Sequence, residues 1–246
     1  MKEFLAMAIT PIFLQKSKKV VPYPTAIQWM KNYVQEIFDG KAAECLWFLE
    51  HPPLYTAGTS AKESDLFNPQ NFPVFHTNRG GQWTYHGPGM RIIYVMMDLR
   101  KPHPTFPDHD IRAFIHKLED WILLTLQQFN IAAEKKEGRV GLWVTDPVTK
   151  KEKKIAAIGI KLSHWISWHG IALNINPKLE NYSGIVPCGL KEYGITSMHE
   201  LGINTSFDTI DQVLCQAWQQ VFVYSLKLRS PPSDLMVDQD SQNNYF

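Results

Sequence analysis

Residues 91–99, with the sequence RIIYVMMDL, form a nearly uninterrupted apolar run. Such a run predicts a β-strand that is buried on both faces of its sheet. Both faces then need cover, and apolar residues at helical spacing predict amphipathic helices that provide it. We expect one helix over residues 22–40, one after an N-cap at Asp108 and one after an N-cap at Asp208.

Shorter apolar segments predict further strands at residues 45–49, 140–145, 155–162 and 165–174. Helices and strands alternate irregularly, and strands follow one another directly in the second half of the chain. This order favours a mixed β-sheet flanked by helices, in an α/β or α+β fold, over a doubly wound parallel sheet. No repeat or linker divides the chain. We therefore expect one domain over residues 1–229, followed by a disordered polar tail over residues 230–246.

Charge and cysteine content exclude several classes of protein. The net charge of the 246 residues is only +1, which gives no indication of a nucleic-acid-binding surface. No apolar run is long enough to span a bilayer, and residues 1–13 lack the apolar core of a signal peptide. Cys45, Cys188 and Cys215 match neither a zinc pattern nor a disulfide framework. We expect a cytoplasmic protein without a membrane, metal or nucleic-acid partner, in which Cys45 and Cys215 are inert packing residues.

Cys188 lies in the turn sequence IVPCGL, between a proline and a glycine. A constrained backbone and small neighbours suit a thiolate nucleophile, although most free cysteines are buried apolar residues. Two other segments favour the nucleophile: RGGQWTYHGPG at residues 79–89 and KIAAIG at residues 154–159. Glycines let a backbone approach a ligand closely. Lys154 differs from the lysines beside it because it begins an apolar strand.

With HPPLYTAG at residues 51–58, these segments occur in the order found in the lipoyl(octanoyl) transferases, which the chain resembles over residues 50–202. That family moves an octanoyl group from acyl carrier protein to a lysine of a lipoyl domain. The resemblance implies the catalytic fold shared by lipoyl transferases, lipoate ligases and biotin ligases. It also implies a catalytic pair, because Cys188 and Lys154 occupy the places of the family's reactive cysteine and lysine. The family's substrate-binding stretches match Arg79, Gly80, Gly81, Gln82, Trp83, Thr84, Tyr85, His86, Ala157, Ile158, Gly159, Gly170, Ile171 and Ala172.

The reaction that the resemblance implies passes through an octanoyl thioester on Cys188, with Lys154 stabilising the thiolate and moving protons. Transfer from a thioester to an amide is downhill, so no cofactor is expected, and the sequence contains no GxxxxGK[ST] phosphate loop. The implied donor is octanoyl-acyl carrier protein. The implied acceptors are lipoyl domains of 2-oxoacid dehydrogenase complexes and the glycine-cleavage H protein. We expect a monomer, in which His86 and His169 line the substrate rather than act as bases.

Two other functions remain open from the sequence. An ATP-dependent lipoate or biotin ligase would need a nucleotide site but not Cys188. A non-enzymatic acyl-binding protein would keep a pocket and be indifferent to both Cys188 and Lys154. The chain also departs from the family at Met90, where glutamine is usual, and at Lys161 and His164, where arginine is common. These departures concern substrate detail more than the class of reaction.

Overall fold

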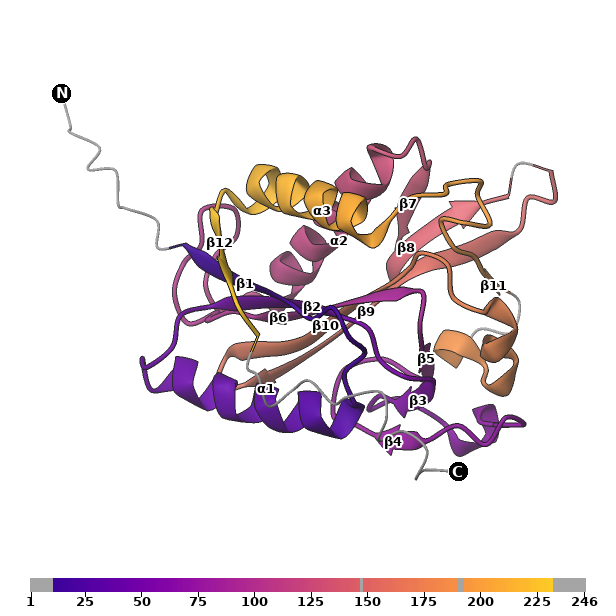
Figure 1. Cartoon of the computed structure of the whole chain (residues 1–246), viewed down its shortest axis with the longest axis horizontal. Coiled ribbons are helices and arrows are strands. Elements are labelled where there is room, and N and C mark those ends of the chain that lie inside the picture. The colour runs from indigo at the N-terminus through magenta and orange to yellow at the C-terminus, as the bar shows by residue number, and fades with distance from the viewer. Residues whose placement is uncertain (1–10, 147, 190–192, 232–246) are drawn as a thin grey trace.

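The computed structural model describes residues 11–146, 148–189 and 193–231, except for the side chain of Cys188. A large mixed sheet lies between two layers, with two helices on one face and a helix and a small sheet on the other (Figure 1). This confirms the predicted fold class. The expected tail lies outside the described residues from position 232 onward. No helix in the described ranges is long and apolar enough to cross a membrane.

The large sheet has nine strands among the described residues. Its main path has the order β12-β1-β2-β6-β10-β9-β8-β7, and β11 pairs with β9. The pairs β12–β1, β1–β2 and β11–β9 are parallel, and the other neighbours are antiparallel. The bounds are β1 (Ile12–Lys16), β2 (Cys45–Leu49), β6 (Met90–Met96), β7 (Ala133–Lys136), β8 (Arg139–Thr145), β9 (Glu152–Ser163), β10 (Ile166–Asn174), β11 (Gly194–Ile195) and β12 (Leu226–Arg229).

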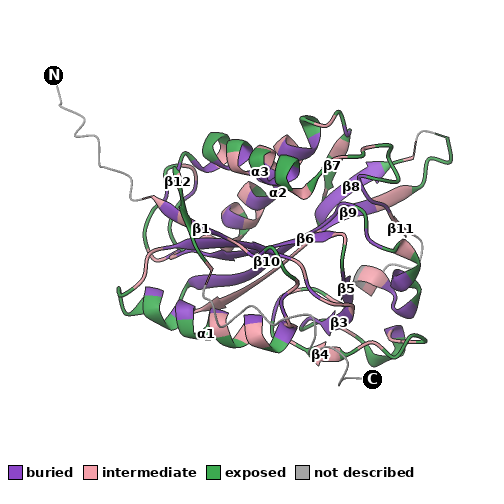
Figure 2. Ribbon diagram, in the orientation of Figure 1, coloured by how far each residue is buried: buried purple, intermediate pink, exposed green. Residues whose placement is uncertain are grey.

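Helices cover both faces of this sheet, as the apolar run at residues 91–99 requires. The helices are α1 (Tyr23–Phe38), α2 (Ile111–Gln127) and α3 (Phe207–Phe222). Every residue of β6 is buried (Figure 2). Ile93 and Val95 belong to the core beneath α2 and α3, whereas Ile92 and Tyr94 belong to the core beneath α1. The alternation along β6 therefore divides one strand between two hydrophobic cores.

The small sheet lies on the α1 side and contains β4 (Val74–His76), β3 (Leu54–Ala57) and β5 (Thr84–His86), in the order β4-β3-β5. The sequence did not predict these three strands. Each has only three or four residues, which is too short to show a hydrophobic period. The strands β1, β7 and β12 were missed as well, because their four or five residues are partly exposed.

Two predicted helix N-caps were wrong by two residues. The N-cap of α2 is Asp110, whose side chain accepts a hydrogen bond from the amide of Ala113, and not Asp108. His109 has a φ of 53°, a left-handed conformation that a helix cannot include, so the helix begins after it. The N-cap of α3 is Ser206, and Asp208 lies in the first turn, where a carboxylate interacts favourably with the helix dipole.

Candidate active site

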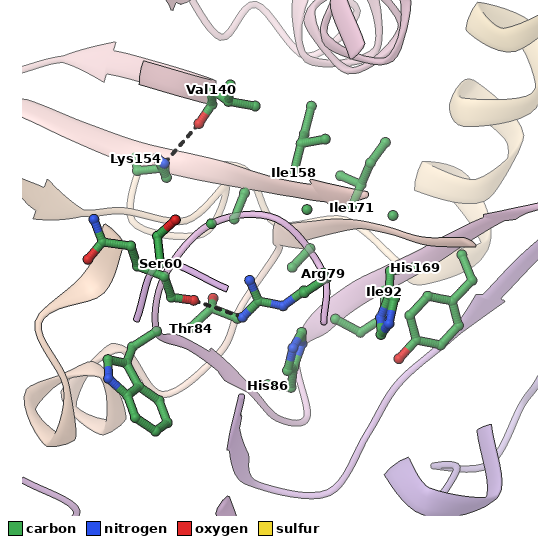
Figure 3. Close-up of a pocket in the computed structure, with 18 of the residues that line it drawn as sticks. Ser60, Arg79, Thr84, His86, Ile92, Val140, Lys154, Ile158, His169 and Ile171 are labelled. Carbon is green, nitrogen blue, oxygen red and sulfur yellow. Dashed lines mark hydrogen bonds between the residues drawn. The ribbon is translucent and has the colours of Figure 1, made fainter. Parts of the chain in front are cut away.

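A cavity of about 340 Å³ lies between the β6–β10–β9 face of the large sheet and the segment 79–84 (Figure 3). All of the predicted substrate-binding residues except Gly80 and Tyr85 line it, and Lys154 lies at one end. The residues around Lys154 include Ser60, Gly138 and Val140, which are exposed, so this end opens to solvent. The opposite end, at Tyr94, is buried. The cavity is thus a channel with one open and one closed end.

Small residues form the sheet side of the channel. Ala157 lies opposite Ala172, and two residues further along the strands Gly159 lies opposite Gly170. These positions carry at most a methyl group, so the space above them stays empty. A Cβ on Gly170 would lie 1.9 Å from the carbonyl oxygen of Ile93, so no larger residue fits there.

Arg79 holds the segment that covers the channel. Its Nη2 donates to the carbonyl and hydroxyl oxygens of Thr56, each at 2.8 Å, and to the carbonyl oxygen of Gln82 at 2.9 Å. Gly80 does not line the channel, and its amide donates to the carbonyl oxygen of Ile160 at 3.0 Å. Arg79 and Gly80 therefore fix the cover against the sheet, a structural role that the sequence could not distinguish from ligand contact.

Tyr85 lies outside the channel because it is the middle residue of β5. Side chains alternate along a strand, so Thr84 and His86 point into the channel and Tyr85 points away. Its hydroxyl accepts a hydrogen bond from Asn181 at 2.8 Å, and its ring contacts Tyr182. We expect Tyr85 to support the channel rather than to contact substrate.

A β-bulge turns Lys154 into the channel. Leu142 of β8 lies opposite Ala156 of β9, but the next residue, Trp143, lies opposite Lys154, which leaves Ile155 as an extra residue. Without this residue Lys154 would share a face with Ala156, beneath α2. With it, Lys154 shares a face with Ala157, as bulges beside functional sites commonly arrange.

The ammonium group of Lys154 has defined contacts at the open end. Its Nζ donates to the carbonyl oxygen of Val140 at 3.0 Å and lies 4.6 Å from the ring centroid of Trp143. Trp143 is itself fixed, since its Nε1 donates to the carbonyl oxygen of Arg139. Lys154 is 6% exposed. A cation is thereby held inside the protein with little freedom to move.

The turn that contains Cys188 adjoins this end of the channel. It forms a 3₁₀ turn, Pro187–Gly189, beside β5. A small space of about 10 Å³ is lined by Pro187 together with Lys154, Thr84 and Ala157, which also line the main channel. Gly189 has a φ of +66° and lies so close to Gln82 that a Cβ would meet its side chain. The Cys188 side chain lies outside the described residues, so its separation from Lys154 stays a prediction.

Buried histidines surround the closed end. Burial lowers the pKa of His51 to about 4 and that of His169 to about 3, and it holds the pKa of His86 well below 6.5. The charge of Arg79 lowers the pKa values of His86 and His169 further. All three imidazoles are therefore neutral at pH 7. The histidines therefore add no charge to the closed end, and the buried guanidinium group of Arg79 nearby is hydrogen-bonded to Thr56 and Gln82.

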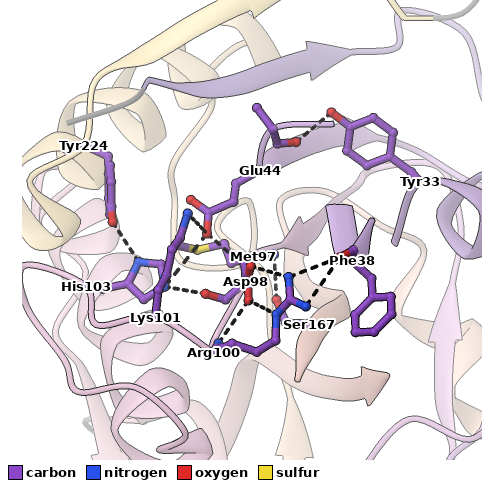
Figure 4. Close-up of polar contacts among 11 residues, drawn as sticks. Tyr33, Phe38, Glu44, Met97, Asp98, Arg100, Lys101, His103, Ser167 and Tyr224 are labelled. Atoms are coloured by element: carbon purple, nitrogen blue, oxygen red, sulfur yellow. Dashed lines mark hydrogen bonds and ion pairs between the residues drawn. The ribbon is translucent and has the colours of Figure 1, made fainter. Parts of the chain in front are cut away.

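A second polar cluster lies just beyond the C-terminal end of β6 (Figure 4). His103 is buried there, with Nδ1 2.8 Å from the hydroxyl of Tyr224 and Nε2 3.0 Å from the carbonyl oxygen of Asp98. The side chain of Glu44 accepts a hydrogen bond from the amide of Asp98. These bonds tie the segment after β6 to the segment before β12, and the cluster is structural.

Known proteins match most of the chain. Residues 22–219 match the lipoyl protein ligase A/B catalytic domain. The octanoyltransferase of Gluconacetobacter diazotrophicus is 50% identical over 217 residues, which cover 88% of this chain and 94% of that protein. The octanoyltransferase of Caulobacter vibrioides is 50% identical over 214 residues, which cover 86% and 92%. The chain belongs to the octanoyltransferase family. It is an acyltransferase with a ligase-type catalytic domain, as the motifs predicted.

Solved structures show that this chain shares its fold with lipoate ligases. A bipartite lipoate protein ligase from Thermoplasma acidophilum has a TM-score of 0.66 at 16% identity, covering 91% of this chain and 88% of that chain. A lipoate-protein ligase A bound with ATP has a TM-score of 0.67 at 14% identity, covering 91% and 90%. At this identity the likeness concerns the fold alone, and it confirms the predicted fold type.

Several residues that line the channel were not predicted from the sequence. Tyr23 comes from α1, Ile92 and Tyr94 from β6, and Arg139 and Val140 from β8. Ile92 and Tyr94 carried a usable signal: on a strand buried on both faces, one alternate set must face the motif-bearing side. No sequence pattern marks Tyr23, Arg139 or Val140, because only the packing of distant elements brings them to the channel.

Proposed function

We propose that the protein transfers an octanoyl group from octanoyl-acyl carrier protein to a lysine of lipoyl domains, through a thioester on Cys188. The observation that carries this proposal is the held ammonium group of Lys154, which lies at the open end of the channel and beside the Pro187–Gly189 turn. The name of the relatives near 50% identity favours a transferase over an ATP-dependent ligase.

In the first step, the Cys188 thiolate attacks the thioester carbonyl of the donor. A bond forms between the Cys188 sulfur and the acyl carbon, and the bond from that carbon to the pantetheine sulfur breaks. The leaving thiolate takes a proton from the Lys154 ammonium group. The positive charge of Lys154 also stabilises the Cys188 thiolate before attack.

In the second step, the ε-amine of the acceptor lysine attacks the acyl-enzyme carbonyl. Lys154, now neutral, takes a proton from the attacking amine, and the Cys188 thiolate leaves. An amide forms, and the enzyme returns to its first state with Lys154 protonated. The 2-oxoacid dehydrogenase complexes and the glycine-cleavage H protein contain the acceptor domains that fit this chemistry.

The channel suits the acyl chain in size and polarity. Its volume of about 340 Å³ falls at the lower end of the range for small-molecule sites, roughly 300–1,000 Å³. Ala157, Gly159, Gly170 and Ala172 leave room for a chain along the sheet, and the histidines at its far end are neutral. We assign the catalytic domain to residues 1–229.

Intact mass after incubation with octanoyl-acyl carrier protein tests the proposal. We expect a gain of one octanoyl group that disappears in Cys188→Ala and Cys188→Ser and persists in Cys45→Ala. Octanoylation of an added lipoyl domain that requires octanoate and ATP, without a gain on the enzyme itself, would identify a ligase instead. Binding of octanoyl groups without any covalent gain would identify a non-enzymatic acyl-binding protein.

A further inference from the structure

We infer that Tyr94 sets the length of acyl chain that the channel accepts, and that His51 is the positioning residue that holds Tyr94 in place. The inference deepens the proposed function and rests on it. His51 does not line the channel, but its side chain is hydrogen-bonded to the hydroxyl of Tyr94, which does.

The register of the strands places Tyr94 at a defined depth. Ile92 lies opposite Ala172, and Tyr94 lies opposite Gly170, two residues further from the open end. Two residues of a strand span about 7 Å. An extended chain advances about 1.2 Å per bond, since three backbone bonds span up to about 3.6 Å. Five or six methylenes therefore fill the distance between Ile92 and Tyr94. The first carbons of an octanoyl group occupy the approach from Lys154.

Tyr94 cannot turn aside easily, because its hydroxyl is fixed. The hydroxyl lies 2.6 Å from Nε2 of His51, and Nδ1 of His51 lies 2.5 Å from the carbonyl oxygen of Val21. A carbonyl oxygen can only accept, so Nδ1 carries the proton and Nε2 accepts from Tyr94. His51 is completely buried. The arrangement is a chain of two hydrogen bonds that ends on the backbone.

Aromatic rings enclose Tyr94 on its other sides. The ring centroid of Trp47 lies 6.0 Å from that of Tyr94, and the ring centroid of His169 lies 6.2 Å away. His169 has a φ of 59° within β10, a strained conformation that persists only where the surroundings enforce it. A chain longer than the channel would have to displace Tyr94 against these contacts. Removal of the Tyr94 ring would instead extend the channel into space bordered by aromatic groups.

Competition between two donors tests this directly. Equal amounts of octanoyl- and dodecanoyl-acyl carrier protein are mixed with enzyme, and the two acyl-enzymes are separated by intact mass. Wild type should take octanoyl. Tyr94→Ala and Tyr94→Leu should raise the ratio of dodecanoyl to octanoyl at least roughly tenfold, because each newly buried methylene contributes about fourfold. Tyr94→Phe keeps the ring but loses the His51 bond, so its ratio should rise less.

Tyr33→Ala is the matched control. Tyr33 is a buried tyrosine of α1, and its hydroxyl donates to the carbonyl oxygen of Ala43 away from the channel. Its truncation should destabilise the protein without changing the ratio. An equal change in Tyr33→Ala, or the wild-type ratio in both Tyr94→Ala and Tyr94→Leu, would overturn the role of Tyr94. Absence of any acyl-enzyme in wild type would overturn the proposed function itself.

Discussion

Gly141 should be essential for the bulge that turns Lys154 into the channel. Gly141 has a φ of +110°, and a Cβ there would lie 2.5 Å from the carbonyl oxygen of Ala156 and 3.5 Å from Cε of Lys154. Its amide also donates to the buried carboxylate of Glu119 at 3.0 Å, which anchors the bulge to α2. The substitution Gly141→Ala therefore strains the backbone and pushes directly on the strand that bears Lys154.

The magnitude follows from these contacts. A non-glycine residue at such a φ costs about 1–3 kcal/mol. Movement of the bulge also weakens the bond to Glu119, and a hydrogen bond to a charged group contributes about 1.5–3 kcal/mol. Gly141→Ala should lower the free energy of unfolding by about 3–6 kcal/mol. Gly202→Ala is the matched control, because Gly202 has a φ of +84° with nothing within 4 Å of an added Cβ. It should show the backbone cost alone, about 1–3 kcal/mol.

Urea denaturation and single-turnover acylation measure the two consequences. We expect Gly141→Ala to lose both stability and acylation rate, even at temperatures where it remains folded, because Lys154 is displaced. Gly202→Ala should acylate like wild type. The reasoning is refuted if Gly141→Ala loses no more stability than Gly202→Ala and acylates at the wild-type rate.

Two further predictions concern the buried thiols and histidines. Burial raises the pKa of the Cys45 thiol to about 12 and also raises the pKa of the Cys215 thiol. Iodoacetamide at pH 8 should therefore label Cys188 first. Rapid labelling of Cys45, found by mass mapping, would be inconsistent with this prediction. Burial lowers the pKa of His51 from its ordinary value of 6.5 to about 4 in the folded protein. Below pH 6.5 the unfolded chain therefore binds a proton that the folded protein does not. The free energy of unfolding falls as the pH drops toward 4. In urea titrations between pH 6 and 5, His51→Gln should reduce the pH dependence of the free energy of unfolding by about 1.2 kcal/mol per pH unit. An unchanged slope would show that His51 is not buried in its neutral form.

The large elements of this fold could be predicted because their patterns are long and local. The apolar run at residues 91–99 predicted burial on both faces, and β6 is buried throughout. The bulge at Ile155 could not be predicted, since it depends on which residue of β8 pairs with Lys154. Its effect is large, because a shift of one residue exchanges the two faces of a strand.

The candidate site likewise combines features that local sequence patterns predict with features that depend on tertiary packing. The three motifs predicted most of the channel wall, because the sheet and the small sheet bring their glycines together. Tyr85 was grouped with its neighbours although alternation along the Thr84–His86 strand turns it away, a distinction available only once β5 is known to be a strand. The closing of the channel by Tyr94 depends on His51, which lies 43 residues earlier in the chain. Contacts of this kind follow from tertiary packing, and no local pattern encodes them.

A two-step experiment with Lys154→Arg tests most directly whether Cys188 is the nucleophile and Lys154 the group that moves protons. Arginine keeps a positive charge near Cys188 but does not give up a proton at neutral pH. With octanoyl-acyl carrier protein alone, intact mass should show some octanoyl-Cys188 in Lys154→Arg and none in Lys154→Ala. After addition of a lipoyl domain, wild type should transfer the group rapidly, and the acyl-enzyme of Lys154→Arg should persist. Transfer by Lys154→Arg at the wild-type rate would contradict the account, because Lys154 would then not be the group that moves the proton.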